Sequence, residues 1–244
     1  MIRSLKSVEM KPLGDSAVIV NFGSVIDPKM AKYIQALQKI LNNNPFEGLI
    51  ECVPSYTNLT IYYDTIMIYR NGKLHPYQFV TEYIENSLQN MDISEENTFQ
   101  LIEIPVCYGG IYGPDLEIVA NQNDISIEEV IKIHSSPEYL VHMIGFAPGF
   151  AFLGGMDDKI ATPRKDVPRL TIPSGSVGIA GKQTGIYPFE TPGGWQLIGR
   201  TPVKLFLPDQ QPPSLLKAGD TIRFYPITET EYKQLEAQNL WVSL

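Results

Sequence analysis

The sequence predicts an α+β protein with two domains, a small α/β domain at residues 1–98 followed by a β-rich domain at residues 99–244. Glycine and proline are unevenly distributed, since residues 1–99 hold only 4 of the 19 glycines and 5 of the 19 prolines. The shift falls near the polar stretch at residues 89–98, which is typical of a linker or of a helix end followed by a loop. Strand and helix patterns alternate before this stretch, and short strand patterns between turn residues dominate after it.

In the first domain, residues 16–22 form the first clear strand pattern. A helix is expected to begin at Pro28 with Asp27 as its N-cap, because proline suits the first helical turn and apolar residues recur at helical spacing up to residues 42–44. The next elements are two strands and a second helix, at residues 49–53, 58–63 and 76–88. With a strand before residue 16, this order predicts a small sheet covered by two helices.

The second domain shows six short strand patterns between turn residues, which predict a compact β-barrel or sandwich. Two helices interrupt them, and either Asp124 or Ser126 caps the second of these. Thr228 and Glu231 form a capping box that predicts a short last helix. The strand patterns lie at residues 101–107, 139–144, 176–181, 196–200, 203–207 and 221–226, and the two helices at 114–121 and 127–134.

The net charge of −8 and the pI of about 4.9 argue against two classes of function. Nucleic-acid binders neutralise phosphates with a basic face, and proteins of anionic membrane surfaces carry polybasic segments. No apolar run approaches the roughly 18–20 residues that span a bilayer, and the first residues contain no apolar stretch of signal-peptide length. Cys52 and Cys107 are far apart and lack a metal-binding spacing. We therefore expect a cytoplasmic protein with reduced thiols and with no nucleic-acid or membrane partner.

One segment, residues 142–204, differs from the rest of the chain in charge. It carries seven basic and four acidic residues, a net charge of +3, whereas the remainder has 12 basic and 23 acidic residues, a net charge of −11. A locally positive, glycine-rich region in an acidic protein indicates an anion-binding site, and arginine forks match carboxylate or phosphate. The alternative is ordinary surface charge combined with turn chemistry.

Two loops of this segment have the composition of a ligand site. Residues 145–155 combine four glycines with three phenylalanines, among them Phe150. Glycine lets the backbone approach a ligand, and phenylalanine supplies apolar walls. Residues 191–195 form a tight turn that ends at Trp195, which is equally consistent with a buried core residue and with a stacking platform.

Common catalytic and nucleotide-binding motifs are absent or incomplete. Residues 176–183 resemble the end of a phosphate-binding loop, but Ser176 replaces the first glycine and Gln183 replaces the residue that holds magnesium. The three histidines, His75, His134 and His142, have no metal-ligand spacing, and we expect no metal site. His134 suits a helix C-terminus, where a cation is favoured. His142 precedes the loop of residues 145–155 and is a candidate general acid or base.

Several long motifs, in the same order, resemble the allophanate hydrolase subunit 1 family over essentially the whole chain. The motifs with the most characteristic residues are 105–110 with 113–116, 134–139, 144–155, 173–188, and 192–195 with 198–202. Bacterial members of this family include one component of an ATP-dependent 5-oxoprolinase and inhibitors of sporulation kinases.

The resemblance implies a cyclophilin-like β-barrel for the second domain. It also implies that the protein acts with a partner of homologous fold, the C subunit of 5-oxoprolinase, and with the A subunit, to open 5-oxoproline to L-glutamate. ATP with Mg²⁺ would be used at the level of the complex, and none would be bound tightly by this chain alone. Phosphorylation of the lactam oxygen would activate this stable amide and create charge that needs arginine or lysine.

The resemblance does not assign roles to individual residues, so we choose the candidates by the chemistry of their side chains. We expect His142 to donate or accept a proton and Arg200 to stabilise developing charge, as the catalytic pair. The substrate-binding candidates comprise two cations, two groups that orient the amide and one apolar wall, which are Arg164, Arg169, Gln183, Tyr187 and Phe150. Two other functions remain open, a regulatory inhibitor of a sensor histidine kinase and a component of a urea-degrading system.

Overall fold

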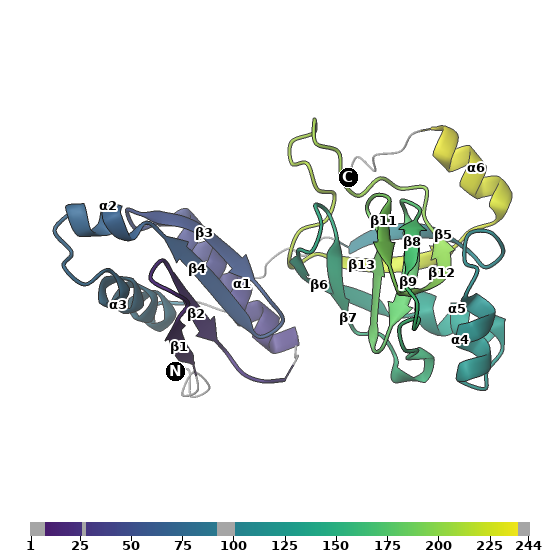
Figure 1. Cartoon of the computed structure of the whole chain (residues 1–244), viewed down its shortest axis with the longest axis horizontal. Helices are drawn as coiled ribbons and strands as arrows, with labels where there is room; N and C mark the ends of the chain where they lie inside the picture. The colour runs from purple at the N-terminus through teal and green to yellow at the C-terminus, as the bar shows by residue number, and fades with distance from the viewer. Residues whose placement is uncertain (1–7, 26–27, 92–100, 239–244) are drawn as a thin grey trace. The chain divides into compact units, whose positions relative to one another are not determined.

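A computed structural model describes residues 8–25, 28–91 and 101–238. The chain divides into two compact units, Met1–Thr98 and Phe99–Leu244, and their helices and strands confirm the α+β class (Figure 1). The proposed N-cap Asp27 and most of the predicted linker lie outside the described residues. That each of these two units is a separate domain stays a prediction.

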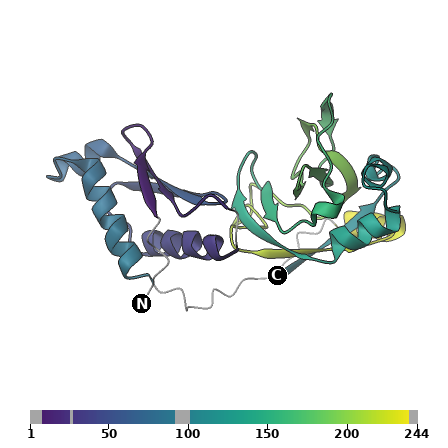
Figure 2. The ribbon, with the colours of Figure 1, turned by 90° about the horizontal axis from the view of Figure 1, so that it is seen from below.

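The first unit is a four-stranded antiparallel sheet with helices packed on one face (Figure 2). Its elements are β1 (Glu9–Pro12), β2 (Ala17–Asn21), α1 (Pro28–Asn43), β3 (Leu49–Pro54), β4 (Asn58–Tyr63), α2 (Thr65–Arg70) and α3 (Pro76–Gln89). The strand order is β1-β2-β4-β3. Alternate residues of β4, Leu59, Ile61 and Tyr63, are buried in a core with apolar residues of α1 and α3. The predicted strands and helices are confirmed, and the short helix α2 is an addition to them.

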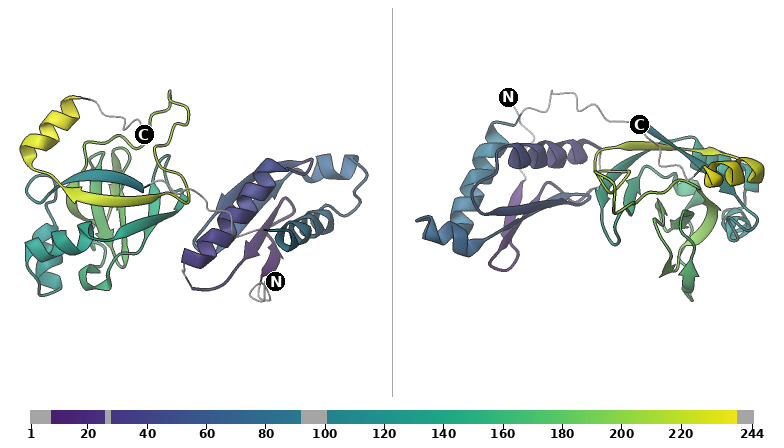
Figure 3. Two further views of the ribbon diagram at one scale, coloured as in Figure 1. Left: turned by 180° about the vertical axis from the view of Figure 1, so that it is seen from behind. Right: turned by 90° about the horizontal axis from the view of Figure 1, so that it is seen from above.

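The second unit is a seven-stranded mixed sheet that curves into a nearly closed barrel (Figure 3). Its strands are β5 (Leu101–Tyr108), β6 (Glu138–Ile144), β7 (Ala151–Gly154), β9 (Ser176–Ala180), β10 (Gln183–Ile186), β12 (Gln196–Arg200) and β13 (Thr221–Pro226). They follow the order β10-β9-β12-β5-β13-β6-β7, with only the β5–β13 pair parallel among the described strands. The two edge strands, β7 and β10, contact each other, so the sheet nearly closes.

Short elements surround this barrel. A two-stranded sheet pairs β8 (Arg169–Ile172) with β11 (Thr191–Gly193), and the helices are α4 (Leu116–Gln122), α5 (Ile127–Ser135) and α6 (Glu229–Ala237). Ser126, rather than Asp124, caps α5, since its hydroxyl accepts a hydrogen bond from the Glu129 N–H at 3.1 Å. The predicted capping box of Thr228 and Glu231 is confirmed at the start of α6.

The prediction of a strand at residues 203–207 is wrong. Within this segment the described structure contains only an isolated bridge between Phe206 and Ser214. Pro202 and Pro208 flank the segment, and proline cannot donate to a strand ladder. Conversely, β7 and β11 form within the segments predicted as loops, and β8 and β10 were not predicted.

The two sides of β9 separate the barrel core from an outer layer. Val177 and Ile179 join the main core, whereas Ala180 joins a second cluster with Trp195 and Leu197. Successive side chains of a strand point to opposite faces, so this second cluster lies on the other face of the sheet. The candidate site lies in this outer layer.

Candidate functional site

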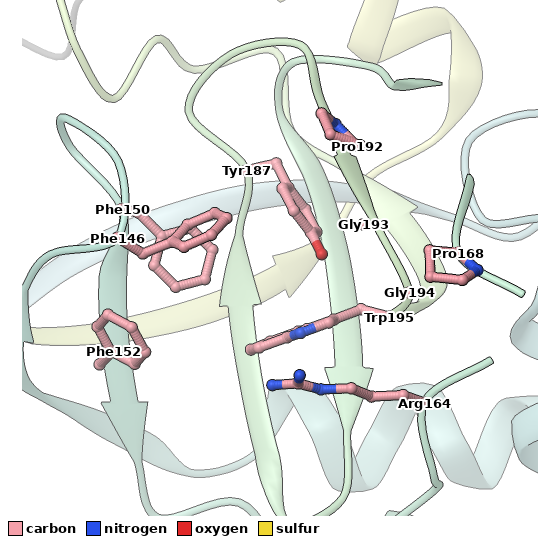
Figure 4. A pocket seen from close by; sticks show the side chains of 10 residues that line it. All are labelled: Phe146, Phe150, Phe152, Arg164, Pro168, Tyr187, Pro192, Gly193, Gly194 and Trp195. Atoms are coloured by element: carbon pink, nitrogen blue, oxygen red, sulfur yellow. The ribbon is translucent and has the colours of Figure 1, made fainter. Parts of the chain in front are cut away.

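A pocket of about 390 Å³ lies in the outer layer, and aromatic side chains form its walls (Figure 4). Phe150 is at the centre of these rings, with centroids 5.5 Å from Phe146, 5.0 Å from Phe152, 5.8 Å from Tyr187 and 5.8 Å from Trp195. All four pairs meet edge to face, an arrangement that stabilises aromatic clusters. The other residues that line the pocket are Arg164, Pro168, Pro192, Gly193 and Gly194.

Two glycines allow the rings to lie this close to the backbone. A Cβ at Gly185 would lie 3.2 Å from the Trp195 ring and 3.3 Å from the Phe150 ring, and one at Gly193 would lie 2.6 Å from the hydroxyl oxygen of Tyr187. A side chain at either position would therefore displace a pocket wall. The absence of a side chain at Gly185 and Gly193 thus makes room for the aromatic rings.

Arg164 is the cation of the pocket, and Figure 4 shows its side chain directed toward the Trp195 ring. Among the described residues, no carboxylate lies within 4.0 Å of its guanidinium. Burial raises the pKa of Tyr187 to about 12, although the charges of Arg164 and Arg169 act in the opposite direction. At neutral pH the pocket therefore presents the neutral phenol of Tyr187 and the guanidinium of Arg164 to a ligand. These groups suit a ligand that joins an anionic group to an apolar ring or chain.

Asp115 is a polar residue of this region that sequence reasoning missed. It is 2% exposed and accepts hydrogen bonds from Arg169 Nη2 at 2.7 Å, from Lys165 Nζ at 3.3 Å and from the Leu197 N–H at 2.7 Å. Burial alone would raise the pKa of Asp115, but these hydrogen bonds and the two positive charges lower it below the usual value. The only sequence signal for this residue was its place in the motif at residues 113–116.

The structure brings three of the predicted site residues together, Arg164, Tyr187 and Phe150, in the pocket wall. Arg169 lies beside them on β8 and is paired with Asp115. Gln183 begins β10 and is not among the residues that line the pocket.

The two predicted catalytic residues also lie outside the pocket lining. His142 is buried on β6 against Gly154, where a Cβ would lie 2.3 Å from its Nε2, and burial lowers the pKa of its imidazole. Arg200 ends β12 with its guanidinium 5.7 Å from the centre of the Tyr112 ring. Their catalytic roles stay predictions.

His134 lies in the last turn of α5, as predicted, but its ring is enclosed in a polar cluster instead of acting as a charged cap. Its Nδ1 is 2.7 Å from the Tyr108 hydroxyl and its Nε2 is 2.8 Å from the Thr184 hydroxyl, while its ring stacks on Phe224. The imidazole is fully buried, and burial lowers its pKa to about 3. The expectation of a charged cap is therefore wrong, because a neutral ring with two hydrogen-bond partners fits this interior.

Within the described ranges, no three His, Cys, Asp or Glu side chains are grouped closely enough to hold a metal ion. The same part of the chain includes no helix long and apolar enough to cross a membrane. Residues 176–183, which resembled the end of a phosphate-binding loop, form the hairpin of β9 and β10 with no helix after them.

The chain belongs to the family described as carboxyltransferase domain, subdomain C and D, which its residues 8–216 match. It is 49% identical to the B subunit of 5-oxoprolinase from Bacillus subtilis (strain 168), over 92% of this chain and 95% of that one. The solved structures that are similar to this chain include two proteins of related sequence. One is the conserved uncharacterized protein PH0987 from Pyrococcus horikoshii, at 45% identity and a TM-score of 0.55 over 92% of this chain and all of that one. The other is TTHA0988, at 33% identity and a TM-score of 0.72 over 87% of this chain and 40% of that one. The relative from Bacillus confirms the resemblance drawn from the motifs.

Proposed function

We propose that this chain is one component of an ATP-dependent 5-oxoprolinase complex that opens 5-oxoproline to L-glutamate. The observation that carries the proposal is the 49% identity to the B subunit of a 5-oxoprolinase across almost the full length of both chains. The chain acts with the A and C subunits as partners, and ATP with Mg²⁺ is consumed at the level of the complex. It works in the cytoplasm, and its second unit is a barrel of the cyclophilin-like type.

The pocket supports this proposal through its chemistry. 5-Oxoproline is a five-membered lactam that carries a carboxylate. The aromatic walls around Phe150 and Tyr187 fit the apolar ring, and the guanidinium of Arg164 fits the carboxylate. The neutral hydroxyl of Tyr187 is a donor for the lactam oxygen, on which charge develops when the amide is activated.

The two residues outside the pocket lining keep the roles expected from their chemistry. His142, whose pKa is lowered by burial, is neutral at physiological pH and suited to accept a proton. Arg200 supplies a positive charge on the same unit. Both roles require the partner proteins or the substrate to bring these side chains to the reacting atoms.

Reconstitution with the partner proteins tests the proposal. We expect 5-oxoproline-dependent ATP hydrolysis and glutamate release only when this chain is present with both the A and C subunits. Equal turnover by those two partners without this chain would contradict it. Omission of 5-oxoproline is the control that separates coupled from background ATP hydrolysis.

A second candidate function, inhibition of a sensor histidine kinase, is favoured by apolar side chains exposed near the pocket. Phe146, Val167 and Leu170 are 73%, 78% and 90% exposed, an unusual concentration for a surface that contacts only water. The test is autophosphorylation of a candidate kinase with this protein in large molar excess. Unchanged phosphorylation would eliminate this function and leave the first proposal intact.

A further inference from the structure

Residues 163–169 form a strap that borders the pocket and carries three cations, Arg164, Lys165 and Arg169. Two hydrogen bonds hold the backbone of the strap in place. The Lys165 N–H donates to the carbonyl oxygen of Gly194 at 2.7 Å, and the Gln196 side chain donates to the carbonyl oxygen of Pro163 at 3.0 Å. The position of Arg164 is therefore tied to the start of β12.

Asp115 neutralises two of these cations, Lys165 and Arg169, and holds them near β12. One of its oxygens accepts from Lys165 and Arg169, and the other accepts from the backbone N–H of Leu197. The Asp115 N–H also donates to the Leu197 carbonyl oxygen at 2.9 Å. A buried carboxylate needs such partners, and once paired it fixes their geometry. Arg164 is left as the strap cation without an acidic partner among the described residues.

Within the described part of the chain, Arg169 has one nitrogen without a hydrogen-bond partner, although Arg169 is not among the residues that line the pocket. Its Nη2 donates to Asp115, whereas its Nη1 is buried and has no hydrogen-bond partner among the described residues. A buried N–H without an acceptor is costly and needs an explanation. Arg169 is paired across the small sheet with Gly193, which lines the pocket next to the Tyr187 hydroxyl.

We propose that Asp115 is the positioning residue of a carboxylate subsite formed by Arg164 and by Nη1 of Arg169. The ligand class is a small carboxylate with an apolar ring, which places its ring among the aromatic walls. A carboxylate has two oxygens, so it can accept from both guanidinium groups. The choice of 5-oxoproline as the natural ligand rests on the proposed function, whereas the carboxylate subsite itself does not.

Titration calorimetry of the full chain with matched probes tests this subsite. Benzoate and benzamide have the same shape but differ in charge, and 5-oxoproline and 2-pyrrolidinone differ in the carboxylate. We expect Asp115→Asn to weaken benzoate and 5-oxoproline about tenfold or more, the size of a lost charge-assisted hydrogen bond, and to change benzamide less than about twofold. Asp220→Asn is the matched control, since Asp220 is also a buried aspartate of this unit, and it should leave benzoate binding unchanged.

Several results would overturn the subsite. These are no benzoate binding by the wild-type chain, an unchanged benzoate affinity in Asp115→Asn, or an equal loss for benzoate and benzamide, which would indicate a merely structural role. If Asp115→Asn does not fold, Arg169→Lys preserves a cation for Asp115 but removes Nη1, and the same selective loss is expected. Selective binding of benzoate without binding of 5-oxoproline would support the subsite and count against the proposed function.

Discussion

Two polar groups of the second unit, His134 and Arg164, lie among aromatic rings but differ in how their hydrogen bonds are satisfied. His134 has a partner on each ring nitrogen and no exposed surface. Arg164 borders a pocket of about 390 Å³ and has no acidic partner among the described residues. The difference separates a group that completes the fold from one that is available to a ligand.

The largest expected effect is on stability, at the closed cluster. His134→Ala removes a fully buried ring and leaves the Tyr108 hydroxyl without its partner. We expect a loss of about 3–5 kcal/mol in the free energy of unfolding, from the cavity and the unpaired hydroxyl together. Urea denaturation measures it, with benzoate affinity as the second readout. A loss below about 1 kcal/mol would contradict tight packing and a satisfied hydrogen bond at this ring.

The same residue predicts how stability depends on pH. The pKa of His134 is lowered from 6.5 to about 3, so between these values the unfolded chain binds a proton that the folded chain does not. The contribution of His134 to the free energy of unfolding is fully present above about pH 6.5. It falls by up to about 1.4 kcal/mol per pH unit on acidification toward pH 3. His142 acts in the same direction, since burial lowers its pKa too. Urea midpoints from pH 7 to pH 4 measure the slope.

His134→Gln is the control for this dependence, because glutamine does not titrate. We expect a shallower slope in this variant than in the wild-type chain. Equal slopes in the two proteins would mean that another group dominates the acid response.

A smaller effect is expected at the mouth of the pocket. Phe146 is 73% exposed and has a φ of 67°, a left-handed conformation that costs a non-glycine residue about 1 kcal/mol or more. We expect Phe146→Gly to leave stability unchanged or to raise it by up to about 1 kcal/mol, and to weaken ligand binding a few-fold. Thermal unfolding and benzoate titration measure the two quantities. A clear loss of stability would show that this ring supports the fold rather than the ligand.

Local patterns in the sequence predicted most of the helices and the longer strands, because caps, proline positions and periodicity act over a few residues. The strands β7, β8, β10 and β11 have only three or four residues each, too few for a periodic pattern. They form because they pair with distant segments and complete the barrel and its outer layer.

The charge pattern and the loop at residues 145–155 located the region of the pocket but not its organisation. Asp115 and Arg169 are 54 residues apart in sequence, and no local feature predicts their contact. The sequence predicted Arg164 and Arg169 as substrate-binding cations and Arg200 as a catalytic one, with nothing to say which of them is paired. Only the structure separates the paired Arg169 from Arg164, and places Arg200 beside Tyr112.

The most direct test measures the KM for 5-oxoproline in ATP hydrolysis by the reconstituted complex. The comparison is Arg164→Gln with Arg223→Gln, a matched change in an arginine that forms an exposed ion pair with Glu103. We expect Arg164→Gln to raise the KM about tenfold or more and to change the free energy of unfolding by less than about 0.5 kcal/mol, while Arg223→Gln changes neither. An unchanged KM in Arg164→Gln would contradict the assignment of the pocket as the substrate site.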